Sequence, residues 1–482
     1  MAMAATKVST GITVLDLPTE LVCQVAANLS ASSDLKSLRS ACSKLNLALE
    51  PFLFSHIRID GKTTRLLEDL ASGHTRAGQY VRNLDIGSLK LDEKDAGEEM
   101  ESILAFRRCW VPALSALKSL GSIDWTVNEK DSHWALEQAI NSLSQVHTIS
   151  TIRLYLRGVW TNPVIHPLRQ ICHFKHLESC SIRVDDNRLM LPIAEGLFDV
   201  NSTHLKRLEL DGGLDAWTDP DYCITPDTDL SLLFDSGAAP KLDILRLSQF
   251  SLSHSSHILS QLGSLKALHL DRCIPYDFWS VFSATNIQLR EVTVDYVDRH
   301  FLDYLGSYRG LERIRLSFNG IQLGTVINDS AAERFYMECL PGHSASLKSI
   351  NIIPKSTGRW CLNADNARVL RQCRGLEDLT IGINIDDVIV KMEEVDHNVG
   401  SDGSNGGIVT ELLHVAKSYR CLNTLVVVLK GNRLPWDLEA TGAAMERFRN
   451  AVSQHAEYVN QSYELHAVTR VKPIPVWDGL RT

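Results

Sequence analysis

The chain has 482 residues, with 49 Lys and Arg against 58 Asp and Glu, so its net charge at pH 7 is -9. This modest negative charge argues against a protein that binds nucleic acid or an anionic membrane, because such proteins carry basic surfaces. No apolar run is long enough to span a bilayer, and the first residues lack the apolar segment of a signal peptide. The 11 cysteines form no C-x-x-C pair, so we expect reduced thiols and a location in the cytosol or the nucleus.

The first predicted elements are two short helices followed by a strand. A helix start is indicated at Leu17 to Glu20, because Pro is tolerated and Glu is favoured in the first turn. The segment "SASSD" interrupts the pattern and provides N-cap residues for a second helix. In that helix apolar residues recur at steps of three and four from Leu35 to Leu49, and Pro51 is expected to end it. The segment "FLFSHIRI" then alternates, which is typical of a strand.

These motifs resemble the F-box. The pattern of that family is present as "LPTE", "LVCQVAANL", "DLKSLRSACSKL" and "PFLF". The aromatic residue often found after the cysteine element is replaced by Leu45, and the proline often found between the first two helices is absent. The resemblance implies docking on a Skp-type adaptor, and through it on a cullin and a RING subunit. The residues it assigns to adaptor binding are Leu17, Pro18, Glu20, Leu21, Val25, Leu35, Leu38 and Cys42. The alternative is a helical unit that only caps the rest of the chain.

A phrase of the form L-x-x-L-x-L recurs about twelve times after this segment. The copies begin at Val81, Leu120, Ile149, Leu177, Leu205, Leu242, Leu265, Leu289, Leu311, Leu347, Leu376 and Leu422. The last two apolar residues of each phrase alternate, as on a strand with one buried face, and helical patterns lie between several copies. The array resembles irregular leucine-rich repeats, in which parallel strands stack over one continuous core. The alternative is an ordinary α/β domain with parallel strands.

The predicted fold class is therefore α/β, with a short helical F-box before an irregular leucine-rich-repeat solenoid. Its strands are expected on a concave side, and its helices and loops outside. We expect residues 1–13 to be disordered, 14–60 to form the F-box, 61–80 a linker helix and 81–430 the solenoid. Residues 431–482 are expected to form a cap and tail, with a capping helix from Thr441 to Asn460.

Two inserts and several short motifs contain residues that can bind metal ions or catalyse reactions. The inserts at 214–230 and 391–407 are rich in turn residues, and the aspartates of the first insert lack the spacing of a calcium loop. Cys172, His173, His176 and Cys180 match no usual zinc spacing. The chain also lacks the glycine-rich, serine-elbow and metalloprotease motifs of common enzymes. We therefore expect no cofactor, no metal and no catalytic residues.

Charged side chains alternate on the predicted open face of the middle strands. In a strand with one buried face, the residues between the apolar positions point away from the core. The candidates for substrate binding are Arg207, Glu209, Asp211, Arg246, His269, Asp271, Glu291, Asp295, Arg313 and Arg315. The alternative is a solvated face with compensating ion pairs.

The sequence thus predicts the substrate-recognition subunit of an SCF-type (Skp adaptor–cullin–F-box) ubiquitin ligase, with no chemistry of its own. In this hypothesis the F-box binds the adaptor and the repeats bind a substrate protein whose identity is open. The alternative function is a leucine-rich-repeat interaction module that acts outside ubiquitin transfer. Neither hypothesis involves nucleic acid or a membrane.

Overall fold

The structure is a computed structural model of the whole chain. It describes residues 17–29, 32–90, 98–158, 167–185, 189–212, 241–250, 262–273, 278–318, 325–354, 357–384, 407–430 and 464–468, and the single positions 252, 387, 446 and 450. The expected disordered start, both inserts except Gly407, and nearly all of the expected capping helix lie outside these residues. The chain forms two compact units, Met1–Leu205 with Gly212–Asp215, and Lys206–Asp211 with Ala216–Thr482.

The first unit begins with three helices and continues as a parallel sheet. The helices are α1 (Thr19–Asn28), α2 (Ser32–Ser40) and α3 (Ser43–Leu53). Its strands are β1 (His56–Ile59), β2 (Asn83–Ile86), β3 (Ser122–Asn128), β4 (Thr151–Arg157) and β5 (Ser179–Val184), which pair in chain order and in parallel. Between them lie α4 (Thr64–Ala71), η2 (Ala77–Gln79), α5 (Glu98–Ala116), α6 (His133–Leu143) and η3 (Gln170–His173), and α8 (Met190–Asn201) follows β5.

The second unit repeats the same strand-and-helix order. Its strands are β6 (Arg207–Gly212), β7 (Ile244–Ser248), β8 (Ala267–Asp271), β9 (Glu291–Val294), β10 (Arg313–Leu316), β11 (Ser349–Ile352), β12 (Asp378–Asn384), β13 (Thr424–Lys430) and β14 (Glu464–Val468). Each pairs in parallel with the next. The helical segments are α11 (Phe278–Ala284), α12 (Arg299–Ser307), α13 (Thr325–Arg334), the π-helical turn Phe335–Cys339, α14 (Leu340–His343), α15 (Ala364–Leu370) and α17 (Ile408–Lys417).

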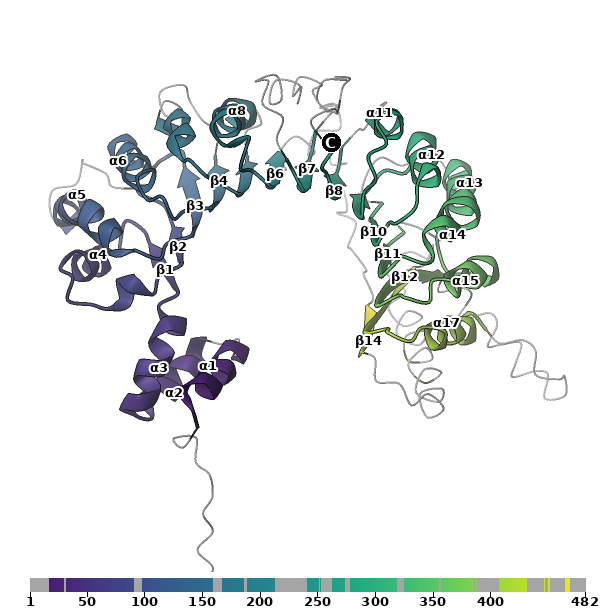
Figure 1. Cartoon of the computed structure of the whole chain (residues 1–482), viewed down its shortest axis with the longest axis horizontal. Helices are drawn as coiled ribbons and strands as arrows, with labels where there is room; N and C mark the ends of the chain where they lie inside the picture. The colour runs from purple at the N-terminus through teal and green to yellow at the C-terminus, as the bar shows by residue number, and fades with distance from the viewer. Residues whose placement is uncertain are drawn as a thin grey trace, which may run out of the picture. The chain divides into compact units, whose positions relative to one another are not determined.

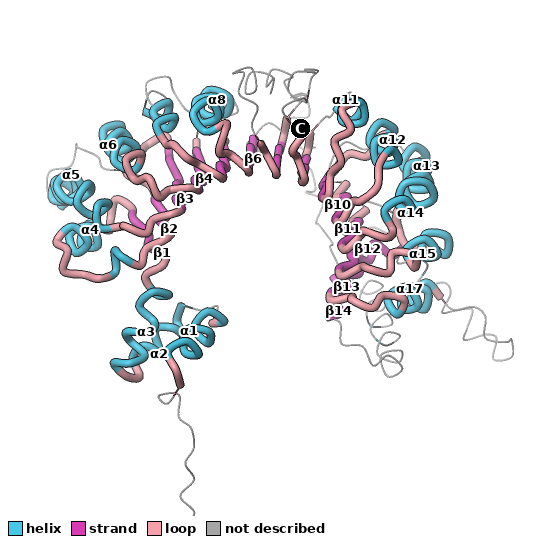
Figure 2. Tube along the Cα trace, viewed as in Figure 1, coloured by secondary structure: helices cyan, strands magenta, loops and turns pink. Residues whose placement is uncertain are grey.

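These pairings confirm the predicted α/β leucine-rich-repeat architecture. Every copy of the L-x-x-L-x-L phrase runs into a strand, and the apolar positions of the phrase are buried, as at Leu205, Leu208 and Leu210. In each unit the helices that lie between strands in the chain run along one side of the sheet (Figures 1 and 2). The core lies between those helices and the inward side chains of the strands. Leu, Ile and Val fill it together with buried aromatic residues such as Trp125 and Trp279.

The sheet differs from the prediction at both of its ends. The segment expected to form a linker helix holds α4 and η2, which lie between β1 and β2 and so form the helical part of the first repeat. Beyond residue 430, where the solenoid was expected to end, β14 adds a further parallel strand through the pairs from Thr424↔Glu464 to Val428↔Val468. The sequence around Glu464 lacks the complete leucine phrase, so its periodicity did not indicate a strand.

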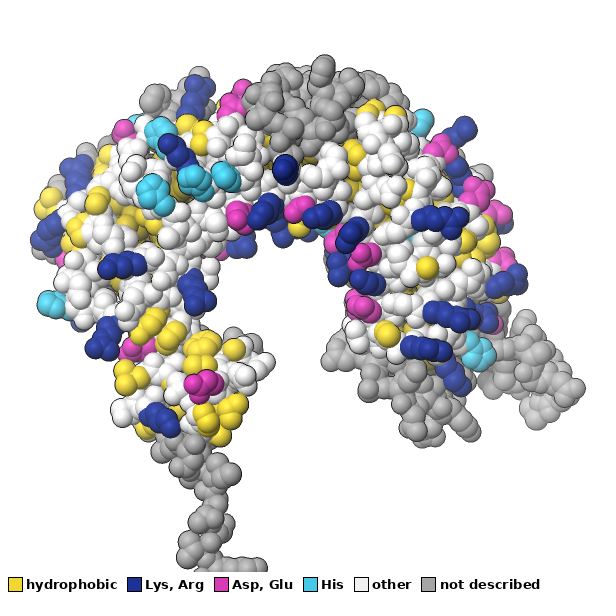
Figure 3. Space-filling model, viewed as in Figure 1, with side chains coloured by type: hydrophobic (Ala, Val, Ile, Leu, Met, Phe, Trp, Pro, Cys, Tyr) yellow, Lys and Arg dark blue, Asp and Glu magenta, His cyan; other side chains and the backbone are white. Residues whose placement is uncertain are grey.

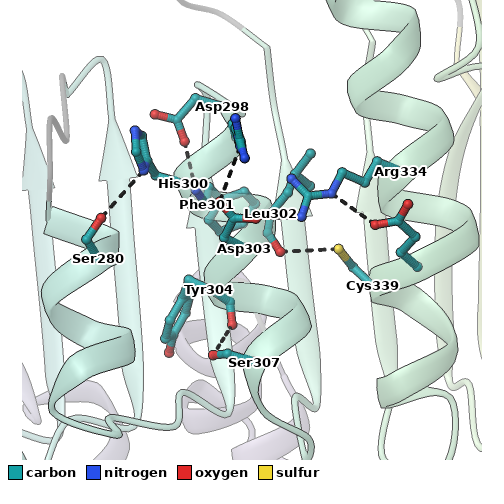
Figure 4. A network of polar contacts seen from close by, with 12 residues as sticks. Ser280, Asp298, His300, Phe301, Leu302, Asp303, Tyr304, Ser307, Arg334 and Cys339 are labelled. Atoms are coloured by element: carbon teal, nitrogen blue, oxygen red, sulfur yellow. Dashed lines mark hydrogen bonds and ion pairs between the residues drawn. The ribbon is translucent and has the colours of Figure 1, made fainter.

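Polar contacts join the helices of the second unit to one another. The Asp298 side chain accepts a hydrogen bond from the Phe301 amide at 2.8 Å and so caps α12. Arg334 of α13 contacts Asp303 of α12 at 2.5 Å, and the Cys339 thiol donates to the Leu302 carbonyl at 3.4 Å (Figure 4). The last two contacts tie α12 to α13 and to the π-helical turn along the helical side of the sheet.

A buried histidine links three parts of the helical layer. His343 is 2% exposed; its Nε2 lies 3.0 Å from the Leu305 carbonyl, and its Nδ1 accepts the Leu311 amide at 3.3 Å. A ring that donates from Nε2 and accepts at Nδ1 is neutral. Burial lowers its pKa from the ordinary value of 6.5.

We expect this histidine to make the second unit less stable in mild acid. The folded state holds His343 neutral, so below a pH of about 6.5 the unfolded chain takes up the proton first and the free energy of unfolding falls. Urea unfolding between pH 7.5 and 5.5 should therefore show a steeper loss of stability for the wild-type chain than for His343→Gln. Parallel pH profiles of the two proteins would contradict this assignment.

Candidate functional site

The three N-terminal helices form a small bundle with its own core. Val22 and Ala26 of α1 and Leu45 and Leu49 of α3 are at most 3% exposed. The helical pattern from Leu35 to Leu49 predicted one helix, but the chain turns at Ala41 and Cys42. Cys42 has extended backbone angles, and its sulfur accepts the Leu45 amide at 3.4 Å, so it caps α3. The turn lets the apolar residues of α2 and α3 face a common core, and Pro51 lies inside α3 rather than ending it.

The structure divides the eight residues assigned to adaptor binding into two groups. Four of them pack partly buried against the bundle core: Leu17, Leu35, Leu38 and Cys42. The other four are exposed: Pro18, Glu20, Leu21 and Val25. Members of the first group contribute to the stability of the bundle, so a substitution there would change folding and binding together. Members of the second group are free to contact a partner.

Pro18, Leu21 and Val25 form an exposed apolar stripe along α1, which we name the α1 stripe. Their spacing of three and four residues places them on one side of the helix. Leu21 is 43% exposed and Val25 is 49% exposed, which is high for large apolar side chains. The opposite flank of α1 faces α3, where the Cys23 thiol contacts the Ala48 carbonyl at 4.0 Å. The stripe therefore lies on the flank of α1 that α3 does not cover, and Figure 3 shows hydrophobic side chains on the surface of this bundle.

One exposed apolar residue of the bundle was not predicted. Leu47 of α3 is 57% exposed, on the side of the helix opposite Leu45 and Leu49. Leu47 is two residues from each of these core positions, whereas residues on one face of a helix recur every three or four. The helical apolar pattern therefore did not predict an exposed apolar residue there.

The outward positions of β6 to β10 carry the charged residues that were predicted there. We name this surface the charged face and define it by Arg207, Glu209, Arg246, His269, Glu291, Arg313 and Arg315. Strand register aligns Glu209, Arg246, His269, Thr293 and Arg315 in one row across the sheet. Figure 3 shows acidic and basic side chains alternating along the strand side of this unit.

Most charges on the charged face are paired within it. The Arg207 Nε lies 2.8 Å from Glu209, and Arg246 lies 3.8 Å from the same carboxylate. The Arg313 guanidinium contacts Glu291 at 3.5 Å, and the His269 Nε2 lies 3.6 Å from Glu291. Exposed pairs of this kind contribute about 0–1 kcal/mol each to stability. For these residues the structure matches the expected alternative of compensating ion pairs.

His269 is more enclosed than its arginine neighbours. Its side chain is 13% exposed, and its Nδ1 lies 2.9 Å from the Thr293 hydroxyl. Burial is the main cause that lowers the pKa of His269, and the positive charge of Arg246 adds to the effect. The ring is therefore neutral at pH 7 and serves as a hydrogen-bonding group between strands.

Asp295 does not lie on the exposed face, contrary to the prediction. It is 4% exposed and accepts a hydrogen bond from the Arg272 amide at 2.6 Å. Burial, with a smaller contribution from the nearby charge of Asp271, raises the pKa of this carboxyl to about 6. Asp295 thus holds the turn after β8, where Arg272 has a left-handed φ of 53°. Of the other two predicted aspartates, Asp271 contacts Arg272 at 3.4 Å, and Asp211 near the end of β6 is half-buried.

The structure does not gather a metal site from the described residues. Within the described ranges, no group of three or more His, Cys, Asp and Glu side chains is arranged to hold a metal ion. Cys180 is buried in β5, whereas His173 and His176 are exposed. The aspartates of the 214–230 insert lie outside the described residues.

We therefore predict that metal removal leaves the fold intact. Exhaustive chelation should leave the thermal transition of the chain where it was, because the core is held by apolar packing. Scanning calorimetry with and without chelator checks this. A lower transition temperature that returns when metal is added back would contradict it.

Comparisons with known proteins add a distant likeness. No family model matches the sequence, and a search of curated proteins finds no match. Among solved structures, the chain is similar to one in the crystal structure of the Rad7 and Elc1 complex in yeast, with 12% identity and a TM-score of 0.39 over 85% of this chain and 88% of that chain. A likeness this distant adds nothing to the functional argument.

No helix among the described residues combines the length and apolar character needed to cross a membrane.

Proposed function

We propose that this chain is a substrate receptor that links a target protein to a ubiquitin ligase of the SCF type. In this proposal the N-terminal bundle is an F-box that docks on a Skp-type adaptor. The adaptor joins it to a cullin and a RING subunit, and the strand side of the repeats holds the target. The chain itself supplies binding surfaces rather than catalysis.

The observation that carries the proposal is the α1 stripe. The bundle already has a complete core in Val22, Ala26, Leu45 and Leu49, yet Leu21 and Val25 remain about half exposed on the first helix. An exposed apolar row on a small helical unit fits a partner groove that receives one face of a helix. The filled F-box pattern around "LPTE" identifies the kind of partner that we expect.

The proposal is tested by co-purification of the tagged full chain. We expect a Skp-type adaptor and a cullin to be recovered together with the chain. Recovery of the adaptor without a cullin would instead support an interaction module that works outside ubiquitin transfer. If neither the adaptor nor the cullin is recovered from cells that contain both proteins, the proposal is contradicted.

A further inference from the structure

We propose that the part of the charged face around β10 and β11 binds an extended, anionic segment of a partner protein, with Arg315 as the anion-binding group. The inference deepens the proposed function, because it rests on the repeats holding a second protein. It names the chemistry of the segment that they hold.

Arg315 differs from the other arginines of the charged face. Arg207, Arg246 and Arg313 each have a carboxylate oxygen within 3.8 Å. Arg315 is exposed, and among the described residues it has neither an ion pair nor a hydrogen bond. A guanidinium offers five N–H donors and keeps its charge at all relevant pH values. Arg315 therefore presents a full positive charge and its whole hydrogen-bonding capacity to a ligand.

The neighbours of Arg315 across the sheet are uncharged. Strand register places Thr293 of β9 on one side and Asn351 of β11 on the other, with Thr380 of β12 next along the row. Neighbouring strands lie about 4.8 Å apart, so the flanking polar side chains are within reach of the same ligand. The carboxylate of Glu291, in the adjacent row, is already shared by Arg313 and His269. A bound anion would thus be the direct counter-charge of Arg315.

Asn351 adds a second recognition group beside the arginine. Its Oδ1 atom is buried and has no hydrogen-bond partner, although most buried polar atoms have one. A carboxamide can accept from one backbone N–H and donate to one backbone carbonyl. The Asn351 side chain as a whole is half-buried, so a turn of its carboxamide would bring the unpartnered oxygen to the surface. There it could accept from the main chain of an extended peptide crossing β10 and β11 while one of the anionic side chains of the peptide contacts Arg315.

The geometry of a guanidinium fits two kinds of anion. Arg forms bidentate hydrogen bonds with carboxylates and with phosphates. The segment is therefore acidic, and its charge comes either from Asp and Glu or from phosphorylated side chains. The two sources share the chemistry that Arg315 recognises, and the experiment separates them.

The test measures binding of three fluorescent peptides to the purified full chain. The peptides share one Gly/Ser sequence and carry two glutamates, two phosphoserines or two lysines. We expect the glutamate peptide, the phosphoserine peptide or both to bind at least tenfold more tightly than the lysine peptide. The Arg315→Ala change should weaken that binding about tenfold or more, and Asn351→Ala should weaken binding of the same peptide. Whichever anionic peptide binds more tightly identifies the source of the charge.

The matched control is Arg299→Ala, which removes an exposed arginine of the same unit that lies on α12 and is paired with Asp303 at 3.7 Å. It should leave peptide binding unchanged, and thermal unfolding checks that each variant is folded. Equal binding of the lysine peptide, or anionic binding that Arg315→Ala leaves intact, would overturn the inference. Adaptor binding is measured separately and does not use the charged face. If the wild-type chain binds the anionic peptide but not the adaptor, the proposed function is contradicted. If it binds the adaptor but not the anionic peptide, this inference is contradicted.

Discussion

Replacing Leu21 and Val25 together by Asp is expected to weaken adaptor binding by about a hundredfold or more. Truncating a well-packed apolar anchor costs about 2 kcal/mol or more of binding free energy, and a charge placed in an apolar groove adds a desolvation cost. Both side chains are about half exposed in the free chain, so the fold should tolerate the change. Calorimetric titration of the full chain with a purified Skp-type adaptor measures the effect.

The control for this experiment is Leu47→Asp. Leu47 is even more exposed, at 57%, but it lies on α3 rather than on the α1 stripe. We expect Leu47→Asp to bind the adaptor as the wild-type chain does. If both variants bind normally, the α1 stripe is not the docking surface. If both lose binding equally, the contact extends over α3 as well. Leu17→Ala is a poorer test, because Leu17 packs against the bundle core.

Asn201→Leu is expected to destabilise the first unit by about 3 kcal/mol. Asn201 is 1% exposed at the end of α8; its Oδ1 accepts the Leu177 amide at 2.9 Å, and its Nδ2 donates to the Phe174 carbonyl at 2.8 Å. Leucine has a similar volume but leaves this amide and carbonyl buried without partners, and each loss costs about 1–3 kcal/mol. Hydrogen exchange of β5 and α8 in mild denaturant should show faster exchange in the variant.

The matched control is Asn141→Leu on α6. Asn141 is exposed, so the same substitution should change stability by about 0.5 kcal/mol or less. Exchange rates in β5 that stay at the wild-type level in Asn201→Leu would show that the buried amide network does not hold the segment before the strand. We expect Asn201→Leu to reduce protection from hydrogen exchange in β5 and α8 only, and to leave exchange in the second unit unchanged.

The repeating architecture could be predicted from the sequence because its signal is local. On a strand with one buried face, alternate residues must be apolar, so a phrase such as "LKRLEL" from Leu205 specifies both the strand and its buried side. The parallel order fits the same pattern, because parallel neighbours need a long crossover connection, and helical segments between several of the phrases provide it. The same logic placed Arg313 and Arg315 on the open side of β10, where the structure has them.

Tertiary structure alone decided which of these residues are available for binding. Leu17 and Leu21 stand four residues apart and look alike in the sequence, but Leu17 packs against the bundle core formed by α1 and α3, whereas Leu21 is exposed. Asp271 and Asp295 look equivalent as well, yet the turn after β8 buries Asp295 beneath the Arg272 amide. Arg315 is distinguished from Arg313 only by the strand beside it, because Glu291 lies opposite Arg313 and Thr293 lies opposite Arg315. Periodicity is a property of neighbouring residues along the chain, whereas burial and pairing depend on contacts between segments that are far apart in it.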